Sequence, residues 1–138
     1  MIEEIQDDII AQLEKITGVI TVDSWQGNIE ELLTKAQRLP ALYVVYQGAL
    51  FESQPSNQPG HAMDFLIVLM GKNLRSRAAG AVSCYTLIEA VRTKLSGHRV
   101  AGYDLLWPVK EDLILAEGGL LVYGLTYRMD NAIWEGEG

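Results

Sequence analysis

Apolar residues recur at intervals of three and four at the start of the chain, and acidic residues fall between them. Ile5, Ile9 and Leu13 form the centre of this stripe, which continues for one more turn. Such spacing places the apolar side chains on one face of a helix. The pattern predicts an amphipathic helix over residues 2–17, and Gly18 suits its C-terminal cap because glycine adopts the left-handed conformation at little cost.

Two further helices are predicted downstream. Asn28, followed three residues later by an acid, is typical of a helix N-cap, and the apolar residues after it predict a helix of about three turns that ends before Pro40. A longer apolar stripe predicts a third helix over residues 78–95, with Gly97 as its stop signal. The short apolar run at residues 19–22 is consistent with an extended segment.

Runs of β-branched and aromatic residues predict a pair of strands in the middle of the chain. Residues 41–52 begin with a stretch that is apolar on both faces, which is typical of a central strand, and residues 63–70 form the second run. Between them, residues 54–61 contain two prolines and few apolar side chains, so an exposed loop is predicted there. The two runs therefore predict an antiparallel ribbon.

The C-terminal part of the chain predicts a second antiparallel unit. Large side chains alternate with others over residues 103–110, and Pro108 favours an edge position or a bulge because it cannot donate a ladder hydrogen bond. Two later apolar runs flank Gly118 and Gly119, which suit a tight hairpin turn. Residues 135–138 have no periodicity and are expected to fray.

Together the elements predict one α+β domain over residues 1–138. Their order is α-α-β-β-α-β-β, which implies an antiparallel sheet of about four or more strands with the helices packed on one face. The chain has 138 residues, of which 49% are apolar, so it can bury a conventional core.

The net charge of −7 restricts the partners that the chain is expected to have. An acidic chain has no positive field to release counterions from a phosphate backbone, so direct nucleic-acid binding is not expected. The acidic N-terminus lacks the pattern of a secretory leader, and the longest apolar run, residues 65–70, is too short to cross a membrane. The single cysteine, Cys84, is expected in the core of the third helix, as in proteins of a reducing compartment.

No cluster of residues predicts catalysis. The histidines His61 and His98 lack the spacing of a metal-binding pair, and surface or turn positions are expected for both. Ser83 and Cys84 have no histidine beside them to act as a base, and the glycines lack the frame of a phosphate-binding loop. The sequence therefore predicts no enzyme, no cofactor and no metal.

The remaining features suit assembly. The densest basic cluster of this acidic chain lies at the predicted turn before the third helix. It consists of Arg75 and Arg77, with Leu74 beside them. This cluster could meet an acidic patch of a second copy in a head-to-tail contact of the kind that closes rings. The alternative is a solvated turn at a helix start. The tryptophans and tyrosines are expected in core and interface packing rather than in stacking on single-stranded nucleic acid.

Three apolar blocks resemble one family of phage proteins. The blocks are Leu39-Pro40-Ala41-Leu42-Tyr43-Val44-Val45-Tyr46-Gln47-Gly48, then Phe65-Leu66-Ile67-Val68-Leu69 running into Lys72-Asn73-Leu74-Arg75, then Tyr85-Thr86-Leu87-Ile88-Glu89-Ala90-Val91-Arg92. In these blocks the chain is similar to the small tail-module family of Mu-like prophages, formerly known only as a domain of unknown function. The similarity covers most of the chain and is a pattern of apolar blocks, not a catalytic signature.

The resemblance implies a structural role in a phage tail. The family is similar to tail terminators, which form a hexameric ring over the tail tube and sheath and offer a surface for joining the head. It implies tube, sheath and head-completion proteins as partners, with assembly in the host cytoplasm and a final place in the virion or tail particle. The family's Leu-Arg-Pro segment appears here as Leu106-Trp107-Pro108, so Trp107 replaces a basic group and is a further interface candidate.

Two alternatives share these sequence features. One is another tail or baseplate adaptor. The other is a small enzyme or ligand-binding domain that uses a cleft beside the proline-rich loop at residues 54–61. A terminator predicts concentration-dependent ring formation, whereas a ligand-binding domain predicts a deep pocket lined by converging polar groups.

Overall fold

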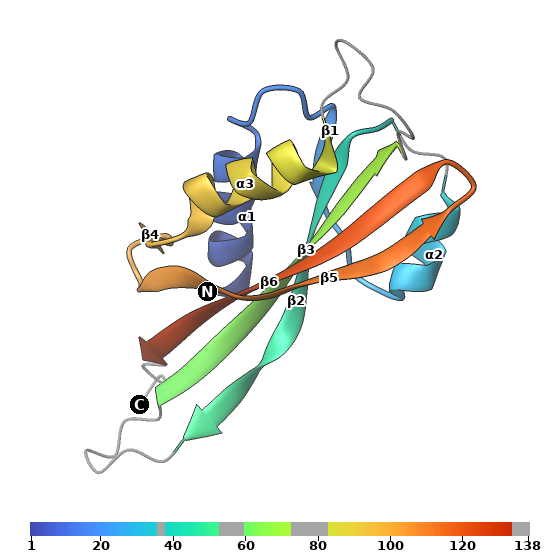
Figure 1. The fold of residues 1–138 in the computed structure, drawn as a ribbon. Helices are drawn as coiled ribbons and strands as arrows, with labels where there is room; N and C mark the ends of the chain where they lie inside the picture. The colour runs from blue at the N-terminus through green and yellow to red at the C-terminus, as the bar shows by residue number, and fades with distance from the viewer. Residues whose placement is uncertain (36–37, 53–59, 73–82, 134–138) are drawn as a thin grey trace.

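The computed structural model describes residues 1–35, 38–52, 60–72 and 83–133. These residues form three helices and one curled sheet of six strands (Figure 1). In chain order the elements are α1 (Ile2–Leu13), β1 (Thr21–Ser24), α2 (Ile29–Thr34), β2 (Ala41–Glu52), β3 (Gly60–Lys72), α3 (Cys84–Leu95), β4 (His98–Arg99), β5 (Leu105–Glu117) and β6 (Leu120–Ile133). The predicted order agrees in outline. The structure adds two short strands to it: β4, and β1, which overlaps the extended segment expected at residues 19–22.

The strands of the sheet lie in the order β1-β2-β3-β6-β5-β4. Long antiparallel ladders join β2 to β3, β3 to β6 and β6 to β5, and β4 adds a short antiparallel ladder to β5. At the other side of the sheet, β1 is parallel to β2, with Thr21 opposite Ala41 and Ser24 opposite Val44. The prediction of a purely antiparallel sheet is therefore wrong at this side, and the sheet is mixed.

The helices α1 and α3 cover one face of the sheet (Figure 1). Ile5, Ile9 and Leu13 of α1 are fully buried, as the apolar stripe predicts. The matching stripe of α3 packs into the same cluster, and its members are Leu87, Ile88, Val91 and Leu95. Removal of this apolar surface from water is the main stabilisation of the fold.

The helix α2 lies on the opposite face. Its fully buried Leu32 packs in a second apolar cluster with Tyr43, Val68 and Met70, whose neighbours along the strands face α1 and α3. The prediction that all helices pack on one face is therefore wrong. The reason is topological: β1 and β2 are parallel, and a parallel pair needs a crossover connection, which carries α2 over the other face.

Two helices are shorter than predicted. The regular part of α1 ends at Leu13, and turns follow it. The helix α2 has six residues rather than three turns, although Asn28 caps it as expected and accepts a 2.8 Å hydrogen bond from the backbone N–H of Glu30. The helix α3 is described from Cys84 onward, and the predicted start near residue 78 lies outside the described residues.

The hairpin between β5 and β6 is as predicted. Glu117 pairs with Leu120, and between them Gly118 and Gly119 form a two-residue turn with φ values of +61° and +77°. Glycine adopts these left-handed conformations without steric cost, which is why such turns select it.

The strand β5 unites two segments that the sequence pattern separates. The predicted alternating run at 103–110 and the apolar run that precedes Gly118 contribute to one strand of 13 residues, and only its first positions pair with β4. A register shift at Pro108 confirms the predicted bulge, and a second shift follows Leu113.

Two predicted terminal and loop features lie mostly outside the described residues. Of the predicted loop at 54–61, the last two positions belong to β3, because that strand begins at Gly60, and the remainder is not described. The predicted frayed tail at 135–138 also lies outside the described residues.

Candidate assembly interface

Trp107 is the one sequence-predicted interface residue that the structure describes. Leu74, Arg75 and Arg77 lie outside the described residues, so their role stays a prediction. Trp107 is on β5, opposite Arg128 of β6.

The side chain of Trp107 is 50% exposed, and its ring lies against the end of α3. A Cβ atom added at Gly97 would come within 3.2 Å of the indole, and Gly97 also has a φ of +75°. Both observations explain why glycine is needed at this position. Trp107 is therefore held by the chain after α3 while half of its surface remains available to a partner.

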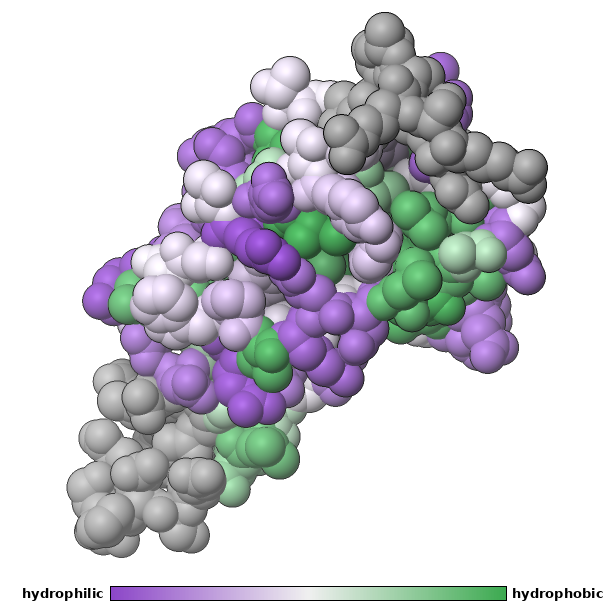
Figure 2. Space-filling view, in the orientation of Figure 1, coloured by the Kyte–Doolittle hydropathy of each residue, from purple (hydrophilic) through white to green (hydrophobic). Residues whose placement is uncertain are grey.

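The outer edge of β5 is open from Trp107 onward. β4 pairs only with Leu105 and Leu106, and no other described strand lies on that side of β5. We call residues 107–117 the β5 edge. Besides Trp107 it carries three exposed large hydrophobic side chains, Val109, Leu113 and Ile114. Figure 2 shows hydrophobic surface gathered over the hairpin end of β5 and β6, beside a hydrophilic body. Such a patch on a strand edge is typical of a protein contact.

The outer edge of β2 is open at the opposite side of the sheet. β1 covers β2 as far as Val44, and no described strand pairs with residues 45–50 on that side. We call these residues the β2 edge. They carry no charged side chain, and Leu50 is 64% exposed. Natural proteins usually blunt open edges with lysines or prolines, whereas here a bulge before Gly48 is the device present. This edge was not predicted from the sequence, although its uncharged composition was a usable signal.

A hollow of about 490 Å³ lies beside the β2 edge, between it and the start of α1. Its described lining is Met1, Ile2, Glu3, Tyr46, Ala49, Phe51 and Met63, in which Glu3 is the one charged side chain. The alternative prediction expected a ligand cleft in this region, but the described lining lacks the converging polar groups of such a site. The hollow is suited to an apolar side chain of a partner.

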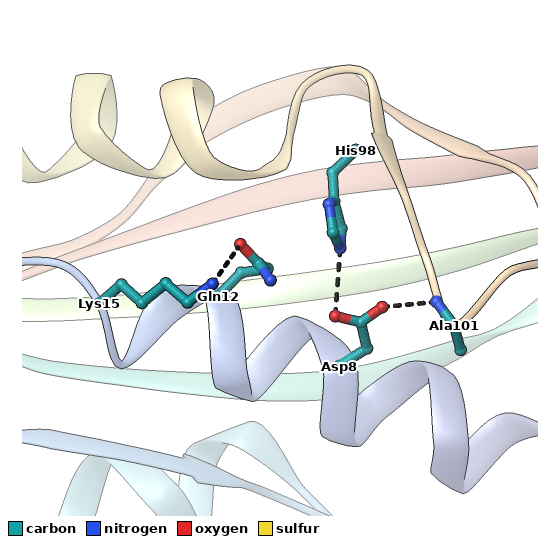
Figure 3. Close-up of polar contacts among 5 residues, drawn as sticks. All are labelled: Asp8, Gln12, Lys15, His98 and Ala101. Atoms are coloured by element: carbon teal, nitrogen blue, oxygen red, sulfur yellow. Dashed lines mark hydrogen bonds and ion pairs between the residues drawn. The ribbon is translucent and has the colours of Figure 1, made fainter.

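A polar contact fixes α1 against the chain that follows α3 (Figure 3). The Asp8 carboxylate accepts a hydrogen bond from the backbone N–H of Ala101 and lies 3.1 Å from Nε2 of His98. Burial acts to raise the pKa of Asp8, but the hydrogen bonds from Ala101 and His98 outweigh it and lower that pKa. His98 lies next to a turn as predicted, yet it is largely covered and bound to α1 rather than free on the surface.

Two bidentate ion pairs join elements of the sheet and of the helix layer above it. Arg92 of α3 donates two hydrogen bonds to Glu111 of β5, and its guanidinium lowers the pKa of that carboxyl. Arg128 of β6 donates two to Asp64 of β3, at 2.7 and 3.0 Å. The first pair ties the middle of β5 to α3.

The described residues include no group of three or more His, Cys, Asp or Glu side chains that could hold a metal ion. Cys84 is buried at the start of α3, which confirms its predicted core position, and burial raises the pKa of its thiol. No helix among the described segments is long and apolar enough to cross a membrane. What the described surface offers is apolar contact area at two strand edges.

Two comparisons with known proteins found a match. Residues 1–124 match the sequence model of the Bacteriophage Mu Gp37 family. Among solved structures, a chain from the virion of a native gene transfer agent particle has a similar fold, with a TM-score of 0.60 and 17% sequence identity. The similarity covers 94% of this chain and 95% of that chain. No curated protein sequence matches this chain.

Proposed function

Because this chain belongs to the Bacteriophage Mu Gp37 family, we propose that it is a tail-terminator-like structural protein that closes the end of a contractile phage-type tail as a homo-oligomeric ring. The observation that carries the proposal is the fold shared with a virion chain over nearly the full length of both. Unrelated functions can share a fold, so the decisive test is assembly itself.

The proposed mechanism is steric. A ring seated on the last layer of the tail tube covers the groups that would bind another layer, so growth of the tube stops. The opposite face of the ring then binds a head-completion protein, and the ring contacts the sheath at its rim. By the family resemblance the ring is a hexamer, which assembles in the host cytoplasm and ends in the virion or tail particle.

Charged and aromatic residues have separate roles in this proposal. Arg75 and Arg77, next to Leu74, face an acidic patch of the neighbouring copy, where opposite charges speed association and select the correct partner. The exposed Glu4 of α1 is one source of such acidity. Trp107 acts as an aromatic anchor, since tryptophans are enriched among the residues that dominate binding energy.

The test is the mass of the protein across a concentration series, measured by light scattering and paired with negative-stain images. We expect rings that increase with concentration, and we expect added tail-tube protein to form short tubes capped by rings. A chain that stays monomeric at high concentration, both in the absence and in the presence of tube protein, would contradict the terminator proposal. Binding to tube ends without any limit on tube length would instead identify another tail adaptor.

Charge reversal tests the basic cluster. We expect Arg75→Glu together with Arg77→Glu to weaken ring formation by roughly tenfold or more, the equivalent of about 1.4 kcal/mol. The matched control is Lys15→Glu on the exposed side of the turn after α1, which should leave assembly unchanged. Equal assembly by the double variant and the control would remove the basic cluster from the interface.

A further inference from the structure

The two open edges belong to one sheet, and their strand directions are complementary. β2, β3, β6 and β5 alternate in direction, so β2 and β5 run in opposite directions at opposite sides of the sheet. If a second copy is rotated about an axis along the strands, its β5 arrives beside the first copy's β2 as an antiparallel neighbour. This placement also keeps α1 and α3 of both copies on the same face.

We propose that neighbouring copies in the ring join by antiparallel pairing between the β2 edge of one copy and the β5 edge of the next. This inference rests on the proposed function. The sheet then continues from copy to copy. Main-chain hydrogen bonds supply affinity in such strand addition, and pockets for individual side chains supply specificity. The facing parts of the β2 and β5 edges are paired in every copy once the ring closes, which reduces the risk of uncontrolled edge association.

The edges lie at different heights along the sheet, which sets the geometry of the contact. Val45 and Lys110 lie at the same height in the sheet. Val45 pairs with Leu66 of β3, Leu66 pairs with Thr126 of β6, and Thr126 pairs with Lys110. From that level the β2 edge runs away from the β5–β6 hairpin, whereas most of the β5 edge runs toward it. Bringing Glu117 beside Val45 requires a shift of about six residues, or roughly 20 Å. Tilted strands in a closed barrel impose a stagger of this kind.

This register places apolar groups together. Leu113 of one copy lies beside Ala49 of the other, because both are four positions from the paired Glu117 and Val45. Both side chains face the layer of α1 and α3, since Leu113 lines a second hollow with residues of α3 and Ala49 packs against the main core cluster. Leu113 is 55% exposed in the single chain and can enter the hollow beside the β2 edge, where burial of its side chain stabilises the contact.

A second copy of this chain fits these edges better than an unrelated strand. Both halves of the contact are present in each chain, on opposite sides of the sheet, which is the requirement for a head-to-tail ring. The short strands agree with the proposed register as well. β1 ends at Ser24, opposite Val44, where the neighbour's hairpin turn would arrive, and β4 begins beyond the other end of the β5 edge.

Cysteine cross-linking tests the pairing in the full chain. One variant carries Ala49→Cys and the other Leu113→Cys, each in a Cys84→Ala background. Each variant is oxidised by itself, and a mixture of the two is oxidised in parallel. We expect a dimer from the mixture only, because directly opposed residues of an antiparallel pair have Cα atoms about 4.5–5.5 Å apart, within the range that a disulfide spans. Leu113→Cys mixed with Ile20→Cys is the matched control, since Ile20 is also exposed but lies on neither edge. A dimer from either edge variant alone, or equal yield from the control, would overturn the proposal.

Lysine substitution gives a second readout that does not need oxidation. Leu50→Lys and Leu113→Lys each place a charge on an edge and should reduce assembly by roughly tenfold or more, whereas Ile20→Lys should not. All three side chains are exposed, so unchanged melting curves are expected. Rings that persist in both lysine variants, together with no cross-link between the two cysteine variants, would reject edge pairing while leaving the terminator proposal intact. Absence of rings from the unmodified chain would reject the terminator proposal itself.

Discussion

At the scale of single residues, Ala101 carries backbone strain. It is the one non-glycine residue in the described part of the chain with a positive φ, +48°. Its backbone N–H donates a hydrogen bond to the Asp8 carboxylate. We expect Ala101→Gly to raise the free energy of unfolding by about 0.5–1 kcal/mol, because the relief of a left-handed alanine exceeds the added entropy of the unfolded chain. Urea titration measures the change. The control Ala11→Gly, in the exposed interior of α1, should lower stability by about 1 kcal/mol. Equal effects would show that Ala101 is unstrained.

Asp8 is also a residue-scale prediction because it makes stability depend on pH. Its pKa is lower in the folded than in the unfolded chain, so its contribution is present above the ordinary value of 3.8 and is lost as the pH falls through the lowered value. We expect Asp8→Asn to cost about 1 kcal/mol at pH 7 and progressively less below pH 4. Asp7→Asn, at an exposed neighbouring site, should show no such trend. Unfolding curves from pH 2 to 7 check both, and a constant cost for Asp8→Asn would contradict this reading.

At the scale of elements, Gly71 sets the distance between β3 and α3. A Cβ atom at Gly71 would lie 2.6 Å from Sγ of Cys84, a distance that real Cβ atoms do not adopt. We expect Gly71→Ala to destabilise the protein by about 1–3 kcal/mol through overpacking. Addition of Cys84→Ala should restore part of this loss, because it removes the sulfur from the contact. A double-mutant cycle by thermal melting measures the coupling, and additive effects would disprove the close approach.

At the scale of the whole molecule, the two faces of the sheet are coupled. Leu13 packs on one face and Leu32 on the other, yet both clusters are built on the same β2 and β3 strands. We expect Leu13→Ala and Leu32→Ala each to lower stability by about 2–5 kcal/mol while unfolding stays a single transition. Circular dichroism and tryptophan fluorescence should give the same midpoint for each variant. Separate midpoints for Leu32→Ala would show that α2 unfolds independently.

The candidate interface could be predicted from the sequence only in part. Trp107 was identified because it replaces a basic residue in a recognisable segment, whereas the exposed Leu113 and Ile114, which lie past the charged residues 110–112 on the same strand, were not singled out. The hollow beside the β2 edge could not be predicted, because its lining comes from the start of α1, from β2 and from Met63 of β3. Residues so far apart in the chain share a site only after the strands have paired.

Features that depend on local spacing follow from the amino-acid sequence. Apolar periodicity specified α1, α3 and the long ribbons, and the glycine pair specified the β5–β6 turn, since each follows from residues within a few positions of one another. Tertiary structure alone decided that β1 is parallel to β2, that α2 covers the other face, and that two edges stay open. These features depend on pairing between segments distant in sequence, where burial of the whole molecule outweighs local preference.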